Sequence, residues 1–288
     1  MSAGTRRIAV LGAGTMGHGI AQIASAAGYQ TTLYDVDMSA VEQGLLRIHE
    51  NLDKAIELGK ATAQECEDTL ARLHMSSDLD RAVHEAEVVI EAVPEIMDVK
   101  QGLFKHMEQA IAPETIIASN TSSLSITEMA SVLKRPERCV GLHFFNPVHI
   151  MKLVEVVWGA ATSEETRVRA MRLSEEFGKV PILVKDSPGF ASSRLGIVLG
   201  MEAIRMVEDG VASPEDIDKA MELGYRHPMG PLRLTDLVGL DVRLGIATYL
   251  HRTLGSEAFR PPKLLKKMVA EGKLGQKSGQ GFYPWDDE

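Results

Sequence analysis

The sequence predicts an α/β fold: a doubly wound sheet with a projecting helical hairpin, followed by an all-α C-terminal domain. Three observations lead to this prediction. Short aliphatic runs alternate with segments of helical periodicity over the first 185 residues. Glycines at a characteristic spacing follow the first run directly, and helical patterns dominate after residue 185. We therefore expect a sheet domain at residues 1–185, with the hairpin at 39–73, and a helical domain at 186–288.

The composition is that of a globular protein and argues against several classes of function. With 288 residues, 44% of them hydrophobic, the chain can build two domains with a core each. Its formal net charge of -9 argues against a general nucleic-acid-binding surface. No apolar run approaches the roughly 18 residues of a membrane span. The chain enters a strand soon after Met1, so we expect a cytoplasmic protein without signal peptide or membrane partner. Cys66 and Cys139 are too few for a disulfide framework or a metal site, so buried or idle thiols and no metal are expected.

The first predicted strand, residues 6–11, leads into a glycine turn. Gly12, Gly14 and Gly17 have the GxGxxG spacing, and a helical stretch follows at residues 18–27. In a Rossmann-like unit the first glycine permits the tight turn, the second lets a pyrophosphate approach, and the third lets the helix pack closely. We predict that the turn binds a dinucleotide through Gly12, Gly14, Thr15, Met16 and Gly17.

The second predicted strand, residues 30–34, ends at Asp35. This is about 20 residues beyond the glycine turn, where an acid can accept hydrogen bonds from the adenosine ribose. A carboxylate would repel a 2′-phosphate, so the sequence favours NAD over NADP. The alternative is a tight turn without a ligand and a surface aspartate.

Residues 39–73 predict the helical hairpin. Apolar residues at spacings of three and four predict a long amphipathic helix that ends near Gly59. Thr62 and Glu65 have capping-box spacing for a second helix, whose apolar face includes Leu73. Seven acidic residues against four basic ones do not make a basic arm, so any phosphate contact would come from single residues such as Lys54. A solvated lysine is the alternative.

Polar residues follow two further predicted strands, at residues 87–93 and 115–119. The first is followed by Glu95 and Lys100, and the second by the cluster SNTSSLSI, which contains Ser122. Strand ends of this kind face the ligand crevice of a doubly wound sheet. Ser122 is therefore a candidate for orienting a substrate hydroxyl or carbonyl. Capping the helix that begins near Ile126 is an equally good explanation.

The stretch GLHFFNPVHIMKLVEVV holds a histidine and a glutamate among apolar residues. A strand at residues 152–157 leaves Glu155 in apolar company, where an unpaired charge costs several kcal/mol. If the chain reverses near Pro147, this carboxylate can meet His143 on a strand at residues 140–144. A histidine held by a carboxylate is a general base near neutral pH. The alternative is a hydrogen-bonded core histidine and a glutamate that faces solvent.

Taken in order, GAGTMGHGIAQ, Asp35, NTSSL, GLHFFNPV and MKLVEVV closely resemble the short-chain L-3-hydroxyacyl-CoA dehydrogenases, nearest the bacterial 3-hydroxybutyryl-CoA dehydrogenases. The likeness covers nearly the whole chain, including the hairpin, the SPGF segment and the closing GQKSGQGFY. It implies NAD-dependent oxidation of an (S)-3-hydroxyacyl-CoA, expected to be the short-chain 3-hydroxybutyryl-CoA, to the 3-oxoacyl-CoA, and the reverse reduction. It also implies a role in fatty acid metabolism and β-oxidation.

The resemblance assigns roles in the reaction to four residues. His143 is implied as the acid/base and Glu155 as the group that orients it and stabilises the imidazolium. Ser122 and Asn146 match residues that hold the substrate and the nicotinamide end of the cofactor.

Further roles implied by the resemblance concern the cofactor and the CoA moiety. Glu95, Lys100 and Lys277 match cofactor contacts, while Asn51 and Lys54 on the hairpin are expected to contact CoA. The chain departs from the family at Ser193, where many members have an asparagine before the arginine, although a hydroxyl can still hydrogen-bond to substrate. In the resembling family the second domain makes a homodimer.

The second domain is predicted as helices at residues 190–208, from Ser213 onward, at 235–254 and at 263–270, with a turn-rich link at 228–231. Two other functions stay open for the chain as a whole. One is an NAD-dependent sugar-acid dehydrogenase of the L-gulonate type, against which Phe144 and Phe145 favour the acyl-CoA branch. The other is a nicotinamide-binding protein without turnover, which would need none of the chemistry around His143.

Overall fold

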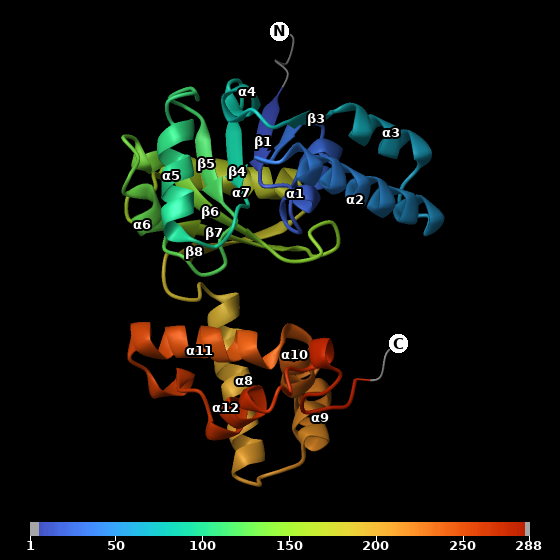
Figure 1. Cartoon of the computed structure of the whole chain (residues 1–288), viewed down its shortest axis with the longest axis vertical. Coiled ribbons are helices and arrows are strands. Elements are labelled where there is room, and N and C mark those ends of the chain that lie inside the picture. The colour runs from blue at the N-terminus through green and yellow to red at the C-terminus, as the bar shows by residue number, and fades with distance from the viewer. Residues whose placement is uncertain (1–5, 286–288) are drawn as a thin grey trace. The chain divides into compact units, whose positions relative to one another are not determined.

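The computed structural model describes residues 6–285 and divides the chain into two compact units, Met1–Ser187 and Pro188–Glu288. Figure 1 shows that the first unit contains the sheet and the second consists of helices. The boundary lies two residues beyond the one expected from the sequence. It falls in the SPGF segment, where a proline and a glycine follow the last strand.

Within the described residues, eight strands form one sheet in the order β3-β2-β1-β4-β5-β6-β7-β8. All neighbouring strands are parallel except β6 and β7. The order reverses between β1 and β4, so the ligand crevice of a doubly wound sheet is expected at the carboxyl ends of these strands. The strands are β1 (Arg7–Leu11), β2 (Gln30–Tyr34), β3 (Leu73–Ser76), β4 (Val88–Glu91), β5 (Ile116–Ser119), β6 (Cys139–Phe144), β7 (Leu153–Trp158) and β8 (Val180–Lys185).

Helices cover the sheet because its central strands are apolar on both faces. In β4 every residue is buried, which is typical of a parallel strand packed from two sides. Side chains of α1, α2 and α7 share one hydrophobic core with the strands. The helices of this unit are α1 (Gly17–Ala26), α2 (Met38–Glu57), α3 (Ala63–Ala71), α4 (Leu79–Val83), α5 (Met97–Met107), α6 (Ile126–Ala130) and α7 (Glu164–Glu176), with a 3-10 turn at Pro136–Arg138.

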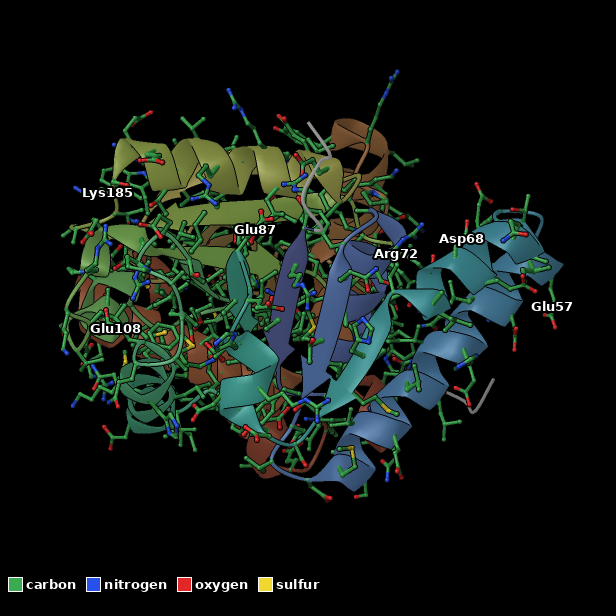
Figure 2. All side chains as sticks on the ribbon, turned by 90° about the horizontal axis from the view of Figure 1, so that it is seen from above. Glu57, Asp68, Arg72, Glu87, Glu108 and Lys185 are labelled. Carbon is green, nitrogen blue, oxygen red and sulfur yellow. The ribbon has the colours of Figure 1, made fainter. Side chains whose placement is uncertain are left out.

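The hairpin consists of α2 and α3, and the prediction of its end at Leu73 was wrong. Thr62 and Glu65 form the capping box expected at the start of α3. The helix ends at Ala71, and Leu73 begins β3, which pairs in parallel with β2. The spacing of Leu73 from the preceding apolar residues suits a helix, but pairing with the exposed edge of β2 overrides it. Figure 2 shows the hairpin extending beyond the sheet, with Asp68 on α3 and Arg72 where the chain returns.

The second unit is all helical, but one predicted helix is two. A single helix over residues 235–254 was expected, whereas Gly239 adopts φ +102° between α10 and α11. Glycine takes this conformation without the steric cost of a side chain, so the chain can turn there. Pro231, expected in a link, is the first residue of α10. The helices are α8 (Ser192–Glu208), α9 (Pro214–Tyr225), α10 (Pro231–Val238), α11 (Leu240–Leu254) and α12 (Lys263–Ala270), with 3-10 turns at Glu257–Phe259 and Gln276–Ser278.

Both cysteines are buried and free, as expected. Burial raises the pKa of Cys139 to about 12, so its thiol stays protonated and unreactive. Between residues 6 and 285, no helix combines the length and apolar character needed to cross a membrane.

Candidate active site

The three glycines of the turn between β1 and α1 are needed for different structural reasons. Gly12 adopts φ +101°, and a Cβ atom there would lie 2.6 Å from the carbonyl oxygen of Ala92. A Cβ at Gly17 would lie 1.6 Å from the carbonyl oxygen of Gly12. A Cβ at Gly14 would meet no atom of the described chain within 4 Å. Close packing therefore requires the first and third glycines, whereas the second leaves space in which a pyrophosphate can approach the backbone.

Asp35 lies directly after β2 and is tied to the same turn. Its Oδ2 atom accepts a hydrogen bond from the backbone N–H of Ala13 at 2.9 Å, and its side chain is half-buried. The contact holds the carboxylate beside the glycine turn, where an acid can bind the adenosine ribose. Thr15 and Met16 complete the turn, Thr15 exposed and Met16 half-buried.

His143 and Glu155 lie opposite each other on the antiparallel strands β6 and β7. The His143 Nδ1 atom and the Glu155 Oε2 atom are 2.7 Å apart, and Glu155 is fully buried. A glutamate that faces solvent, the alternative left open by the sequence, is therefore excluded. The carboxylate favours the proton on Nδ1, so Nε2 is the nitrogen that can exchange a proton with a substrate.

The segment between these strands is held by Lys179, the residue just before β8. The ammonium of Lys179 donates to the carbonyl oxygens of Val148 and Met151. Burial lowers the pKa of Lys179, so the two carbonyl contacts offset part of the cost of its charge. These bonds fix the course of the chain that follows Asn146.

A cavity of about 390 Å³ lies beside His143. It brings together side chains that the sequence places far apart, from the ends of β4, β5 and β6 and from the glycine turn. Its lining residues are Met16, Ala92, Val93, Glu95, Lys100, Asn120, Ser122, His143, Phe144, Phe145 and Asn146. Six of the predicted site residues are among them: Met16, Glu95, Lys100, Ser122, His143 and Asn146.

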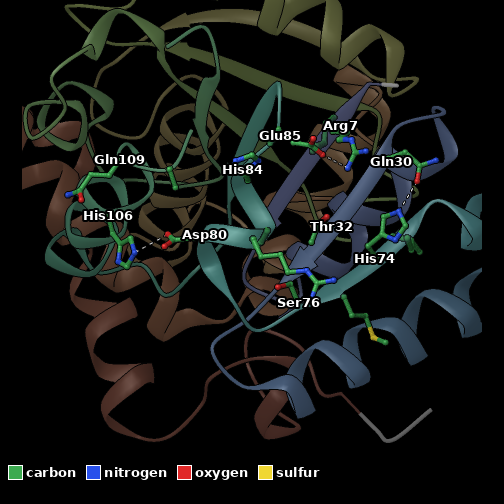
Figure 3. Close-up of a pocket in the computed structure, with 17 residues that line it drawn as sticks. Arg7, Gln30, Thr32, His74, Ser76, Asp80, His84, Glu85, His106 and Gln109 are labelled. Atoms are coloured by element: carbon green, nitrogen blue, oxygen red, sulfur yellow. Dashed lines mark hydrogen bonds and ion pairs between the residues drawn. The ribbon is translucent and has the colours of Figure 1, made fainter. Parts of the chain in front are cut away.

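A larger hollow, of about 1060 Å³, lies elsewhere in this unit (Figure 3). Its walls come from the amino-terminal parts of β1 and β2, from all of β3, and from α4, the end of α5 and the residues that follow these helices, and they include none of the predicted site residues. Polar side chains on its wall pair with one another, Arg7 with Glu85 at 2.8 Å and His106 with Asp80 at 3.2 Å. Doubly wound sheets bind ligands at the carboxyl ends of their strands, so the smaller cavity beside His143 is the candidate active site.

Glu95 connects the turns that follow β4 and β5. Its Oε1 atom accepts hydrogen bonds from the Thr121 hydroxyl at 2.6 Å and from the Ser122 backbone N–H at 3.0 Å. Its Oε2 atom lies 3.2 Å from the Lys100 ammonium. Burial raises the pKa of Glu95, but the Thr121 hydrogen bond, the Lys100 charge and the Ser122 amide outweigh it and hold the pKa below its usual value. Glu95 is therefore ionised at neutral pH.

Ser122 does not cap the following helix, which was the other explanation for it. The hydroxyl of Ser125 accepts the backbone N–H of Glu128 and caps α6. Ser122 is exposed on the cavity wall instead, with its hydroxyl 3.4 Å from Glu95 Oε1.

Two residues that shape this cavity were not singled out from the sequence. Glu91, the last residue of β4, is fully buried and pairs with Lys100. The Asn120 side chain accepts the backbone N–H of Phe144 at 3.0 Å and so ties the end of β5 to the end of β6. A signal for Glu91 was present, because it is an acid in an apolar strand, the same pattern that singled out Glu155.

Two family models match the chain. One is the 3-hydroxyacyl-CoA dehydrogenase, NAD binding domain, over residues 7–187, and the other is the 3-hydroxyacyl-CoA dehydrogenase, C-terminal domain, over residues 189–285. The chain belongs to the 3-hydroxyacyl-CoA dehydrogenase family. This confirms the family and fold class predicted from the sequence, and it confirms an NAD-dependent dehydrogenase.

Relatives of this dehydrogenase are similar over almost their full length. The chain is 49% identical over 283 residues to the "Probable 3-hydroxybutyryl-CoA dehydrogenase" of Bacillus subtilis (strain 168), with 98% of each chain covered. It is 43% identical to the mitochondrial hydroxyacyl-coenzyme A dehydrogenase of Homo sapiens, with 97% of this chain and 91% of the relative covered. Among solved structures, the (S)-3-hydroxybutyryl-CoA dehydrogenase of Ralstonia eutropha matches with a TM-score of 0.94 at 40% identity, covering 98% of this chain and 100% of that one.

The remaining predicted residues of the dehydrogenase lie outside the cavity lining. On α2, the Asn51 amide donates to Gln22 of α1 at 3.1 Å, while Lys54 is exposed. Ser193 and Lys277 belong to the second unit. Ser193 lies in the first turn of α8, and the Lys277 ammonium pairs with Asp241 at 2.6 Å. Asn51 thus has a packing contact of its own, which the sequence gave no means to foresee.

Proposed function

We propose that this protein oxidises the 3-hydroxyl of (S)-3-hydroxybutyryl-CoA with NAD and catalyses the reverse reduction of acetoacetyl-CoA. The observation that carries the proposal is the buried His143–Glu155 pair at the wall of a cavity that also contains Ser122 and Asn146. The Bacillus subtilis and Ralstonia eutropha relatives are named as 3-hydroxybutyryl-CoA dehydrogenases, which supports the short acyl chain. A role in fatty acid β-oxidation is the metabolic setting that we propose for it.

The chain's own part in the reaction is to move a proton. His143 Nε2 takes the proton of the 3-hydroxyl while the C3 hydrogen leaves as hydride, so the C–O bond becomes a carbonyl. NAD, when bound, supplies the hydride acceptor. Glu155 keeps the imidazole in the tautomer that can accept the proton and stabilises the imidazolium that forms.

Other predicted residues take binding roles in this proposal. The Ser122 hydroxyl and the Asn146 amide hold the reacting end of the substrate and the nicotinamide. The glycine turn with Thr15 and Met16 holds the pyrophosphate, and Asp35 holds the adenosine ribose. Glu95, Lys100 and Lys277 act on the cofactor, whereas Asn51, Lys54 and Ser193 act on the acyl-CoA.

We also infer that the second unit forms a homodimer. Large apolar side chains are exposed on it, including Leu195 at 68% and Leu223 at 80% of their surface. Exposed apolar residues on several helices of one unit favour a protein partner over solvent. A sedimentation mass equal to one chain at micromolar concentration would contradict the dimer.

The proposed function is tested by following NADH loss with acetoacetyl-CoA, with NADPH and a free sugar-acid pair assayed in parallel. We expect rapid NADH loss with the thioester, little with NADPH because of Asp35, and none with the sugar acid. Turnover of the sugar acid alone would support the gulonate-type enzyme. Tight NADH binding without turnover of either substrate would support a binding protein without catalysis.

A further inference from the structure

Lys100 and Glu91 form a buried ion pair beneath the active-site cavity. Lys100 lies in the first turns of α5 with 1% of its side chain exposed, and Glu91 at the end of β4 is completely buried. The ammonium of Lys100 contacts Glu91 Oε1 directly. Glu91 also accepts hydrogen bonds from the Ser119 hydroxyl at 2.6 Å and from the Val93 backbone N–H at 2.9 Å. Its carboxylate thus connects the ends of β4 and β5 with α5.

The Lys100 ammonium has three N–H donors, and three acceptors of the chain surround it. They are Glu91 Oε1, Glu95 Oε2 at 3.2 Å and the Val93 carbonyl oxygen at 3.3 Å. Its donors are therefore committed to the protein. Although Lys100 lines the cavity, it acts there through its charge and through the groups that it holds.

Glu95 connects the buried ion pair to the cavity wall. It lies between Lys100 on one side and the turn after β5 on the other, where it accepts the Thr121 hydroxyl and the Ser122 backbone N–H. Glu91 and Lys100 are both buried, so Glu91 cannot move without leaving the Lys100 charge poorly compensated in the interior. The Glu95 side chain is 38% exposed and is held in place by its contacts with Lys100, Thr121 and Ser122. The position of Ser122 consequently depends on the ion pair below it.

We propose that Glu91 is a positioning residue for the dehydrogenase reaction: it fixes Lys100, and through Lys100 and Glu95 it fixes the turn that carries Ser122. The inference rests on the proposed function, because Ser122 matters only if it holds the reacting groups. A purely structural ion pair would affect folding alone. Displacement of a substrate-holding group by about 1 Å is enough to slow turnover markedly.

The chain offers a matched control for this proposal. Glu108 and Arg138 form a second nearly buried pair, with side chains 9% and 7% exposed and 3.0 Å between Oε1 and Nη2. Neither residue lines the candidate active site. Removing the charge of Glu108 disturbs a comparable ion pair without touching the turn that carries Ser122.

The test compares Glu91→Gln, Glu91→Asp and Glu108→Gln with the parent in acetoacetyl-CoA reduction and in thermal unfolding. We expect Glu91→Gln to lower kcat/KM on the order of ten- to a hundredfold. Glu91→Asp should recover part of that loss because it restores the charge. Glu108→Gln should lower Tm but leave kcat/KM within about twofold, since its site is remote from the reacting groups.

A kcat/KM of Glu91→Gln within about twofold of the parent, with a Tm loss like that of Glu108→Gln, would overturn the proposal. If Glu91→Gln does not fold, the double variant Glu91→Gln/Lys100→Met removes both charges together and avoids an unpaired ammonium. Full activity of that double variant would overturn the proposal as well.

If the parent itself does not reduce acetoacetyl-CoA, the proposed function fails separately. The NADH dissociation constants of the same variants then decide about Glu91, and an unchanged constant would overturn its role.

Discussion

The two units of this dehydrogenase both bury carboxylates, but they satisfy them in different ways. In the first unit, Glu155 faces His143 and Glu91 faces Lys100, so each buried acid is partnered by a side chain that can carry a positive charge. In the second unit, Asp236 accepts the backbone N–H groups of Phe282 and Tyr283 and the indole N–H of Trp285, all at 2.9–3.0 Å. Donors of this kind do not lose their proton near neutral pH.

The difference separates the His143–Glu155 arrangement, for which we propose a part in the reaction, from a purely structural one. A carboxylate that faces an imidazole changes with the protonation state of its partner, which is useful beside a substrate. A carboxylate surrounded by amides is a fixed charge that fixes the course of the backbone. Asp218 follows the second pattern, because it accepts two backbone N–H groups and the hydroxyl of Tyr283.

The closing GQKSGQGFY motif can be understood from the same contacts. A Cβ atom at Gly281 would lie 2.2 Å from Asp236 Oδ1, and a Cβ at Gly230 would lie 2.2 Å from the Cβ of Asp218. Glycine at each position therefore makes room for a buried carboxylate. The end of the motif, Gly281 to Tyr283, therefore serves the structural contacts of Asp236.

The largest effect is expected when the histidine of the His143–Glu155 pair is removed. His143→Ala should lower the rate of acetoacetyl-CoA reduction on the order of 10² to 10⁴, because the general acid/base is lost. Steady-state kinetics at saturating NADH measure the effect, with Asp236→Asn as the comparison. A His143→Ala protein that works within a few-fold of the parent would show that the pair is only a core contact.

A change on the structural side should act on stability instead. In Asp236→Asn, the amide cannot serve Phe282 N–H, Tyr283 N–H and Trp285 Nε1–H together. We expect the free energy of unfolding to fall by about 3 kcal/mol, since buried donors are left unsatisfied. Urea unfolding at constant m-value measures the change. An unchanged free energy of unfolding would mean that the hydrogen bonds to Asp236 do not stabilise the second unit.

The smallest effect is expected at Glu95, which has both an amide partner and a charged partner. Its pKa in the folded protein lies below the ordinary value of 4.5, so ionised Glu95 stabilises the fold above that pH. The contribution is lost as the pH falls through the folded pKa. The difference in Tm between the parent and Glu95→Gln should therefore be largest near neutral pH and shrink below about pH 4. A difference that grows on acidification would mean that the carboxylate is destabilising when charged.

A buried pair could be proposed from the sequence only where its two residues lie on adjacent strands. Glu155 and His143 are twelve residues apart on adjacent strands, and the cost of an unpaired buried charge was enough to propose their contact as one of two alternatives, which the structure decides. Glu91 carried the same signal, but its partner Lys100 comes from a helix. Recognising that pair requires knowing which face of α5 turns toward β4.

By itself, the sequence determined the strand, glycine turn and helix that follow one another at the start of the chain, and the acid after β2. These depend on backbone conformations and side-chain spacings that neighbouring residues impose on each other. The family followed from the resemblance of the motifs. Tertiary structure alone decided that Leu73 joins the sheet edge, that Gly239 divides two helices, and that Lys100 commits its donors to Glu91 and Glu95. The physical reason is that hydrogen-bond partners and space come from segments distant in sequence, and no local pattern contains them.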